Sequence, residues 1–271
     1  MLRQLRYDFS MFLKRTPFLI ICSMLILYIF MLTFSSLYDK NNIQLQSYGS
    51  AYMANLIMSQ YSPFRYTSLV LVFPLLIAIP IGIMMTSERK SLINIFVRQN
   101  KKVYIISKLI TSFIIGFLMM LITLVAAILF GYIIFGEEQS YYIQFTTLFY
   151  GYSIDGIKTT IRYYNLYFLN PMLYLVLYSL LSSVMMGIVA QLTMIIALFT
   201  KFKVVIYGGV FMLSMLTVFV HPMIVPFYEL LSPYKYVSIE LINSQYFYPI
   251  AFFMISVIAS IIFVRKDVML K

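Results

Sequence analysis

The sequence predicts an all-α integral membrane protein with six transmembrane helices, and two observations lead to this fold class. Hydrophobic residues make up 62% of the 271 positions and charged residues only 11%, with a mean hydropathy of +0.91. A soluble domain carries roughly twice that share of charge. The apolar residues are also gathered into long charge-free runs, separated by segments that hold the charges. A run of about 20 apolar residues crosses the hydrocarbon core of a bilayer as a helix.

Residues 1–15 form a basic segment before the first apolar run. Four apolar side chains recur in it at helical spacing, and its cations lie elsewhere on the helix: Leu2, Leu5, Phe9 and Phe12 against Arg3, Arg6 and Lys14. This pattern predicts a short helix that lies in the cytoplasmic interface of the membrane. An ordinary basic flank of the first span is the alternative.

The first two spans are predicted at residues 16–38 and 66–87, on either side of a polar loop at 39–65. Both are long enough to cross a hydrocarbon core of about 30 Å. The loop is rich in Ser, Asn, Gln and Tyr, as expected of an outside loop. Pro74 and Pro80 should kink the second span, because each removes a backbone hydrogen bond.

The segment 88–108, ERKSLINIFVRQNKKVYIISK, is a markedly basic, amphipathic stretch between two apolar runs. Lys and Arg near the ends of spans keep a loop on the cytoplasmic side. Its apolar residues have helix-like spacing, which would lay one face on the membrane or on a neighbouring span: Leu92, Ile95, Phe96, Val103 and Ile106. We expect this segment to meet a cytoplasmic partner. The alternative is a positive-inside anchor that binds only lipid head groups.

The third span is predicted at residues 109–135, and a tyrosine-rich outside loop at 137–162 follows it. We place the fourth membrane helix at about 172–199, with Pro171 in its first turn. Small residues recur every fourth position within this helix, at Ser179, Ser183 and Gly187. Such a small-xxx-small face lets another helix approach closely. The neighbouring helix belongs either to another subunit or to the same chain.

A short inside turn with Lys201 and Lys203 leads to a fifth span at residues 204–220. Residues 221–249 then hold four prolines among many apolar and aromatic residues. This composition predicts short helical pieces that dip into the outer leaflet as a re-entrant hairpin. The sixth span is predicted at 250–264.

Six spans place both termini in the cytoplasm, and the charges agree with this topology. The predicted inside segments hold fifteen of the 20 lysines and arginines but three of the nine acidic residues. The net charge of +11 therefore lies on one face, as the positive-inside rule requires. Five or seven spans would destroy this separation. The sequence thus predicts a multi-pass protein of the cell membrane, and its basic charge does not indicate nucleic acid binding.

The sequence offers little chemistry for an active site. The predicted spans hold no ionisable Asp, Glu, Lys, Arg or His, which ion-coupled transporters usually need. Gln191 is the most polar side chain in a span and is expected to bond a neighbouring helix. The single Cys22 and single His221 offer no metal cluster. No Walker A motif is present, so energy for active transport would come from another polypeptide. We predict no enzyme activity and no metal or cofactor in this chain.

Several residues match one known family: Glu88, Arg89, Arg98, Lys101, Tyr104 and Lys108 inside, then Leu231, Ser232, Pro233 and Tyr234 outside. With the layout of spans, they make the whole chain resemble the permease subunit of an ABC transporter of the type-two exporter family. The chain departs from the family at two places. Ser91-Leu92 replaces a Gly-Thr pair that often follows Glu-Arg, and Gln99-Asn100 replaces a Ser-Pro pair.

The resemblance implies that residues 1–271 form a single permease domain with a coupling helix at 88–102, which docks on a separate cytoplasmic ATPase. Its coupling residues would be Glu88, Arg89, Lys90, Leu92, Ile95, Phe96, Arg98, Lys101 and Lys102. A second permease chain, identical or related, would complete the complex, with ATP and Mg²⁺ bound by the ATPases. The family also implies outward transport of an amphipathic substrate, such as a peptide, an antibiotic or a lipid-like molecule. Peptide export or antibiotic resistance would be the biological role.

Two other classes of protein remain open at this point. A passive channel would have no ATPase partner and no nucleotide dependence. A membrane-embedded sensor or scaffold would bind a ligand with its outside loops and signal through the basic segment.

Overall fold

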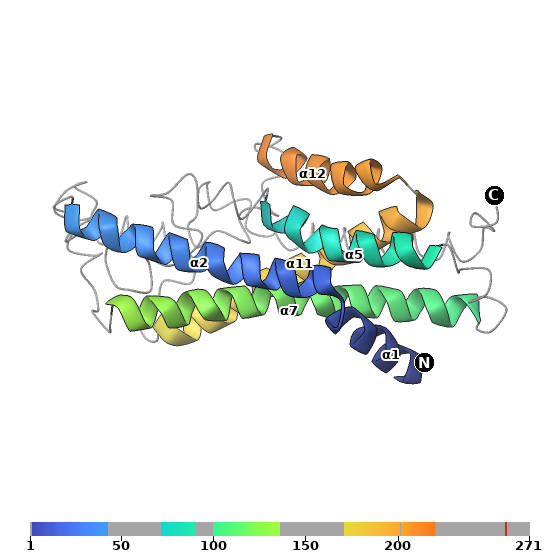
Figure 1. Cartoon of the computed structure of the whole chain (residues 1–271), viewed down its shortest axis with the longest axis horizontal. Coiled ribbons are helices and arrows are strands. Elements are labelled where there is room, and N and C mark those ends of the chain that lie inside the picture. The colour runs from blue at the N-terminus through green and yellow to red at the C-terminus, as the bar shows by residue number, and fades with distance from the viewer. Residues whose placement is uncertain are drawn as a thin grey trace, which may run out of the picture.

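The computed structural model describes residues 2–42, 72–89, 100–135, 171–200, 202–219 and 258. Within these residues the fold is entirely helical and contains no strand, in agreement with the predicted class. Figure 1 shows the six helices, which are α1 (Leu2–Leu13), α2 (Thr16–Asn42), α5 (Phe73–Arg89), α7 (Lys101–Phe135), α11 (Pro171–Phe199) and α12 (Lys203–Phe219).

A sharp bend separates α1 from α2. The axes of Gln4–Leu13 and Thr16–Met31 meet at 61°. Pro17 explains the break, because it has no N–H to donate to the carbonyl of Leu13, so the helical hydrogen bonds cannot continue through it. The short N-terminal helix expected from the sequence is thus present as α1, at an angle to the apolar helix that follows.

Two helix boundaries differ from the predicted ones. The α2 helix continues one turn beyond residue 38, to Asn42. The α7 helix begins at Lys101, so the last part of the basic segment is the first part of the apolar helix and not a separate loop. The α5 helix runs from Phe73 to Arg89, and residues 66–71 of the predicted second span lie outside the described residues. Pro74 lies in the first turn of α5 and Pro80 lies inside the helix.

Among the described residues, two helices are long and apolar enough to cross a membrane, at Lys101–Phe130 and Ser179–Phe199. A third is added if the bent pair of α1 and α2 counts as one span. Shorter apolar helices lie at Phe73–Glu88 and Lys203–Met212. The predicted hairpin at 221–249 lies outside the described residues, as does the sixth span at 250–264 apart from the helical Ile258.

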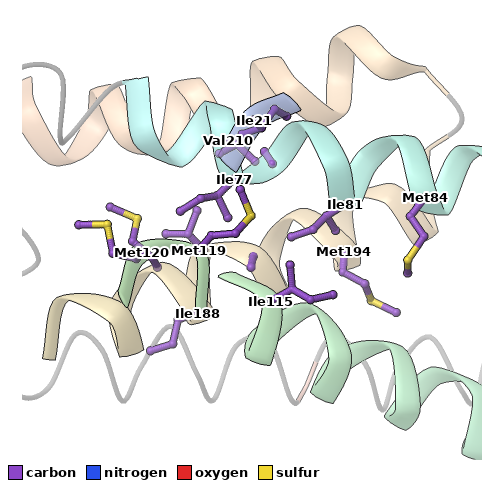
Figure 2. Close-up of a cluster of buried hydrophobic side chains, with 14 of the residues drawn as sticks. Ile21, Ile77, Ile81, Met84, Ile115, Met119, Met120, Ile188, Met194 and Val210 are labelled. Atoms are coloured by element: carbon purple, nitrogen blue, oxygen red, sulfur yellow. The ribbon is translucent and has the colours of Figure 1, made fainter. Parts of the chain in front are cut away.

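The α11 helix lies at the centre, in contact with α5, α7 and α12, while α2 packs on α5 and α7. Figure 2 shows the core where these helices meet, formed by Ile21, Ile77, Ile81, Met84, Ile115, Met119, Met120, Ile188, Met194 and Val210. Methionine is frequent here, and its unbranched side chain fills irregular gaps between helices. In Figure 1 the end of α5, the start of α7 and the connection from α11 to α12 lie at the same end of the bundle.

The α7 and α11 helices approach each other closely at two glycines. A Cβ atom added to Gly116 would lie 2.5 Å from Ala190 Cβ and 2.7 Å from the carbonyl oxygen of Met186. A Cβ atom on Gly187 would lie 2.8 Å from the ring of Phe113. Only glycine fits at these two positions, because any side chain would push the helices apart. Of the small residues singled out in the sequence, Gly187 therefore contacts a helix of the same chain.

The other two small residues of that face are buried within the chain as well. Ser183 is fully buried and Ser179 is 5% exposed. Ser183 Oγ donates a hydrogen bond to the carbonyl oxygen of Ser179 one turn earlier, which satisfies its hydroxyl inside α11. Gln191, one turn beyond Gly187, donates a long hydrogen bond of 3.4 Å from Nε2 to the carbonyl oxygen of Leu109 on α7. The expected bond from Gln191 to a neighbouring helix is therefore present.

Candidate functional site: a buried ion-pair network

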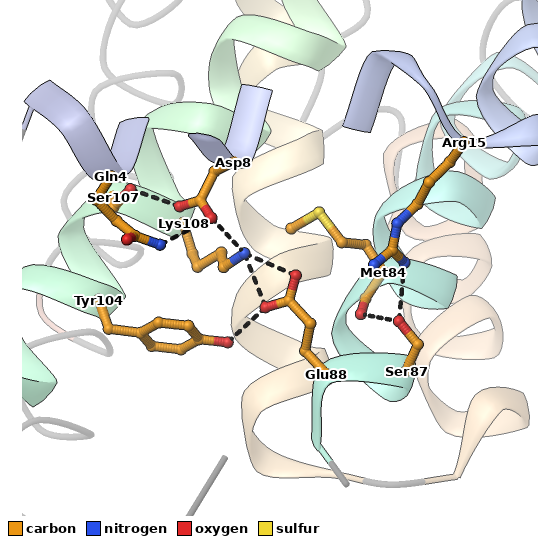
Figure 3. Close-up of polar contacts among 9 residues, drawn as sticks. All are labelled: Gln4, Asp8, Arg15, Met84, Ser87, Glu88, Tyr104, Ser107 and Lys108. Carbon is orange, nitrogen blue, oxygen red and sulfur yellow. Dashed lines mark hydrogen bonds and ion pairs between the residues drawn. The ribbon is translucent and has the colours of Figure 1, made fainter. Parts of the chain in front are cut away.

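A lysine held between two carboxylates joins three helices. Figure 3 shows Lys108 of α7 between Asp8 of α1 and Glu88 of α5. Lys108 Nζ lies 2.9 Å from Asp8 Oδ1 and 2.8 Å from both carboxylate oxygens of Glu88. The side chains of Asp8 and Lys108 are 1% and 2% exposed, and that of Glu88 is 18% exposed. The ion pair between α1 and α7 is therefore buried, while Glu88 retains some access to solvent.

Neutral side chains complete the hydrogen bonding of the two carboxylates. Ser107 Oγ donates to Asp8 Oδ2 at 2.6 Å, and Gln4 Nε2 donates to Asp8 Oδ1 at 3.0 Å. The hydroxyl of Tyr104 donates to Glu88 Oε2 at 2.9 Å. Lys108 Nζ also lies 5.4 Å from the centre of the Tyr104 ring, within the range of a cation–π contact. Buried charges are tolerated when they are paired and hydrogen-bonded in this way.

The local sequence explains why these groups meet. Tyr104, Ser107 and Lys108 are spaced three and four residues apart, so they share one face of α7. Asp8 occupies the buried face of α1, one turn before Phe12. Glu88 is the penultimate residue of α5, so its carboxylate can reach out from the end of that helix. A cation is favoured beside the last turn of a helix, and Lys108 supplies one there.

A second cation contacts the same end of α5. Arg15, in the break between α1 and α2, donates from Nη1 to Ser87 Oγ at 2.8 Å. Ser87 Oγ in turn donates to the carbonyl oxygen of Met84 at 2.8 Å. The last turn of α5 is thus held by Arg15 on one side and by Lys108 on the other, as Figure 3 shows. Arg15 precedes residues 90–99 in the sequence, and Lys108 follows them.

The network connects three helices through charged side chains, two of which are almost fully buried. No group of three or more His, Cys, Asp or Glu side chains suited to a metal ion occurs within the described ranges. Removing one partner of a buried ion pair typically costs about 3–5 kcal/mol, because the other charge is left without compensation. The arrangement therefore resists any separation of α1, α5 and α7 at this end of the bundle.

Four of the coupling residues expected from the sequence lie in the part of the chain that the structure describes, and five lie outside it. Glu88 is bonded to Lys108 and Tyr104, and Arg89 is the last residue of α5. Lys101 and Lys102 lie in the first turn of α7, which Asn100 caps through a 3.0 Å bond from the Lys102 N–H to Asn100 Oδ1. Lys102 is exposed and Lys101 half-buried. The remaining coupling residues lie outside the part of the chain that the structure describes: Lys90, Leu92, Ile95, Phe96 and Arg98.

Sequence reasoning missed the pairing of Asp8 with Lys108. The predicted third span began at residue 109, so Lys108 counted as a cytoplasmic loop charge when in fact it is buried in α7. One signal was available in the sequence. Asp8 follows Leu5 and precedes Phe12 at helical spacing, which places an acid on the apolar face of α1. An acid on an apolar face requires a buried cation, and the lysine nearest to an apolar run is a natural candidate.

Comparison of the chain with protein-family models, with curated proteins and with solved structures finds no match. The fold and the ion-pair network are therefore the observations from which a function can be argued.

Proposed function

We propose that this chain is the membrane-spanning permease subunit of an ATP-driven ABC exporter of the type-two kind. In this proposal the chain crosses the cell membrane six times with both termini in the cytoplasm. A separate ATPase subunit binds ATP and Mg²⁺, and a second permease chain completes the transporter. The substrate is an amphipathic molecule such as a peptide, an antibiotic or a lipid-like compound.

The observation that carries the proposal is the position of the ion-pair network relative to residues 90–99, the central part of the basic segment. Glu88 precedes residues 90–99, and Tyr104 and Lys108 follow them, so the network closes the base of this segment. Lys108 also binds Asp8, which adds α1 to the same connection. A displacement applied by an ATPase at residues 90–99 would therefore move α1, α5 and α7 together. A coupling element requires this kind of mechanical link between a docking segment and its helices.

The arrangement of helix ends further supports the proposal. Two basic connections meet at one end of the bundle: the one that joins the end of α5 to the start of α7, and the one that leads from α11 to Lys203 of α12. Cations gathered at one end agree with a cytoplasmic face. In this arrangement Glu88 acts as an anchor inside the permease, and the exposed Lys102 is free to face the ATPase.

The first test is to purify the chain in mild detergent and identify the proteins that accompany it. We expect a stoichiometric subunit with Walker motifs and ATP hydrolysis in the complex. A preparation that contains no ATPase, in detergents that preserve known complexes of this kind, would contradict the proposal and favour a passive channel or a membrane sensor.

The second test reverses the charge of Arg98, Lys101 and Lys102 by substitution with Glu. We expect normal membrane insertion but loss of ATPase association and transport, because the proposed docking surface changes sign. The matched control reverses three cations of the predicted outside loops, with Lys40→Glu, Lys158→Glu and Arg162→Glu. The control should retain its ATPase. Normal association and transport in the first variant would exclude a coupling role for these residues.

A further inference from the structure

The outer face of α1 combines cations with exposed apolar side chains. Tyr7 is 59% exposed and Met11 is 41% exposed. Tyr7, Met11 and Lys14 stand at positions i, i+4 and i+7, so their side chains share one face of the helix. The helical hydrogen bonding extends to Lys14, whose N–H donates to the carbonyl oxygen of Ser10. Arg6 is exposed beside Tyr7. This surface is therefore amphipathic, although the opposite face of α1 is packed against the protein.

The packing of that opposite face fixes which way α1 is turned. Phe12 is 1% exposed and meets the ring of Phe18 at 5.1 Å between centroids. Asp8 is held by Lys108 and Ser107 of α7. Because an ion pair, a hydrogen bond and a ring contact all lie on one side of α1, rotation of the helix about its axis would break them together.

The ion pair also sets the charge of the outer face. Asp8 is the single acidic residue of α1, and its carboxylate is buried against Lys108. The exposed charges of α1 and the following turn, at Arg6 and Lys14, are consequently all positive. An amphipathic face with cations and no exposed acid is complementary to a negatively charged surface.

The bend at Lys14 and Arg15 turns α1 away from the direction of α2. The α2 helix is apolar, and its exposed side chains include Leu19, Ile20 and Met24, as in a helix surrounded by lipid. If α2 crosses the bilayer along its normal, α1, which is inclined by 61° to it and joined to it by a two-residue break, lies closer to the membrane plane than to that normal.

We propose that the outer face of α1 binds the head groups of anionic phospholipids in the cytoplasmic leaflet. Arg6 and Lys14 bind the lipid phosphates, and Tyr7 and Met11 enter the boundary between head groups and acyl chains. The buried pair of Asp8 and Lys108 holds the helix in the orientation that this contact needs. The inference depends on membrane insertion and is independent of the proposed transport function.

The chain contains no tryptophan, which gives a direct test. The variant Tyr7→Trp carries a single tryptophan at the proposed contact. The full chain would be reconstituted into vesicles that contain either brominated phosphatidylglycerol or brominated phosphatidylcholine at equal mole fraction. Bromine quenches tryptophan fluorescence over a short range, so quenching reports which lipid lies against α1.

We expect stronger quenching by the brominated phosphatidylglycerol at low ionic strength, and a smaller difference between the lipids at high ionic strength. Adding Arg6→Gln and Lys14→Gln should lower the preference for phosphatidylglycerol by roughly fivefold for each cation removed. Both side chains are exposed, so these substitutions leave the core intact. Lys203→Gln, at an exposed cation of α12, is the matched control and should leave the preference unchanged.

Three results would overturn the proposal. Equal quenching by both lipids at low ionic strength would show that the contact has no preference for anionic head groups. No quenching by either lipid would show that α1 faces water or is covered by another protein, such as an ATPase. An unchanged preference in the double glutamine variant would show that Arg6 and Lys14 do not bind the lipid.

Discussion

Lys108 and Asp8 are 100 positions apart in the sequence, yet Lys108 Nζ lies 2.9 Å from Asp8 Oδ1 with both side chains almost fully buried. Lys108 also binds Glu88, so one ammonium group connects the N-terminal helix to the two helices on either side of residues 90–99. Buried ion pairs give little net stability relative to apolar residues, but they specify which helices meet and in which orientation. We therefore regard Lys108 as the residue that defines this end of the bundle.

Substitution Lys108→Met should destabilise the protein strongly. Two buried or half-buried carboxylates would lose their cation, and the expected cost is about 3–5 kcal/mol in the free energy of unfolding. Titration of the purified protein with a denaturing detergent, followed by circular dichroism, measures this quantity. Lys102→Met is the control, because Lys102 is an exposed lysine of the same helix and should cost little. Equal stability of the two variants would mean that the ion pairs do not form.

The pairing of Asp8 with Lys108 can be measured separately by a double-mutant cycle. Asp8→Asn alone leaves Lys108 bound to Glu88, so it should cost less than Lys108→Met. The two substitutions together should cost less than the sum of the single costs, with a coupling energy of roughly 1–3 kcal/mol for residues in contact. The same cycle with Asp8→Asn and Lys102→Met should show additive effects. Additivity in both cycles would contradict a direct contact between Asp8 and Lys108.

Local signals in the sequence account for much of what could be predicted. The expected helix at about 172–199 with Pro171 in its first turn matches α11, Pro171–Phe199, because proline is favoured at a helix start and a long apolar run follows it. The sequence predicts the third span from residue 109, whereas the α7 helix begins at Lys101, because Lys101 and Lys108 resemble loop charges when only composition is considered. The contact between Lys108 and Asp8 depends on tertiary packing. No fixed spacing in the sequence marks such a contact, because the two residues lie 100 positions apart.

Gly116 and Gly208 should respond in opposite ways to the substitution Gly→Ala. At Gly116 the added methyl group would overlap Ala190 and the backbone of Met186, so α7 and α11 must separate. We expect a loss of about 1–3 kcal/mol in the free energy of unfolding. At Gly208 the added methyl group has no described atom within 4 Å apart from its chain neighbours and its own helix backbone, and alanine should stabilise the helix by roughly 0.5–1 kcal/mol. The same detergent titration compares the two variants. Similar effects at both positions would argue against the close packing of α7 on α11.

Gln191→Met should leave the stability nearly unchanged. The hydrogen bond from Gln191 to Leu109 is long, at 3.4 Å, and the buried Gln191 Oε1 atom accepts no hydrogen bond from the residues that the structure describes. An unsatisfied buried acceptor costs roughly 1–3 kcal/mol, which offsets the modest gain from the bond that Gln191 makes. Methionine fills a similar volume without a polar atom. A large loss of stability would show that Gln191 has stronger partners than this geometry indicates, and unchanged stability with lost transport would assign it a role in the substrate path.

Cysteine labelling can test the predicted topology, because Cys22 is the single native cysteine and Cys22→Ser gives a background without thiols. In that background, Gln139→Cys introduces a thiol in the predicted outside loop and Lys102→Cys introduces one at the start of α7. A membrane-impermeant maleimide should label position 139 in intact cells, and position 102 only after permeabilisation. The opposite pattern would place the basic segment and the ion-pair network outside the cell, where an ATP-hydrolysing partner could not reach them. Labelling of both positions in intact cells would place residues 102 and 139 on the same side of the membrane. The chain would then cross the membrane an even number of times between them, or not at all, and α7 would not be a span.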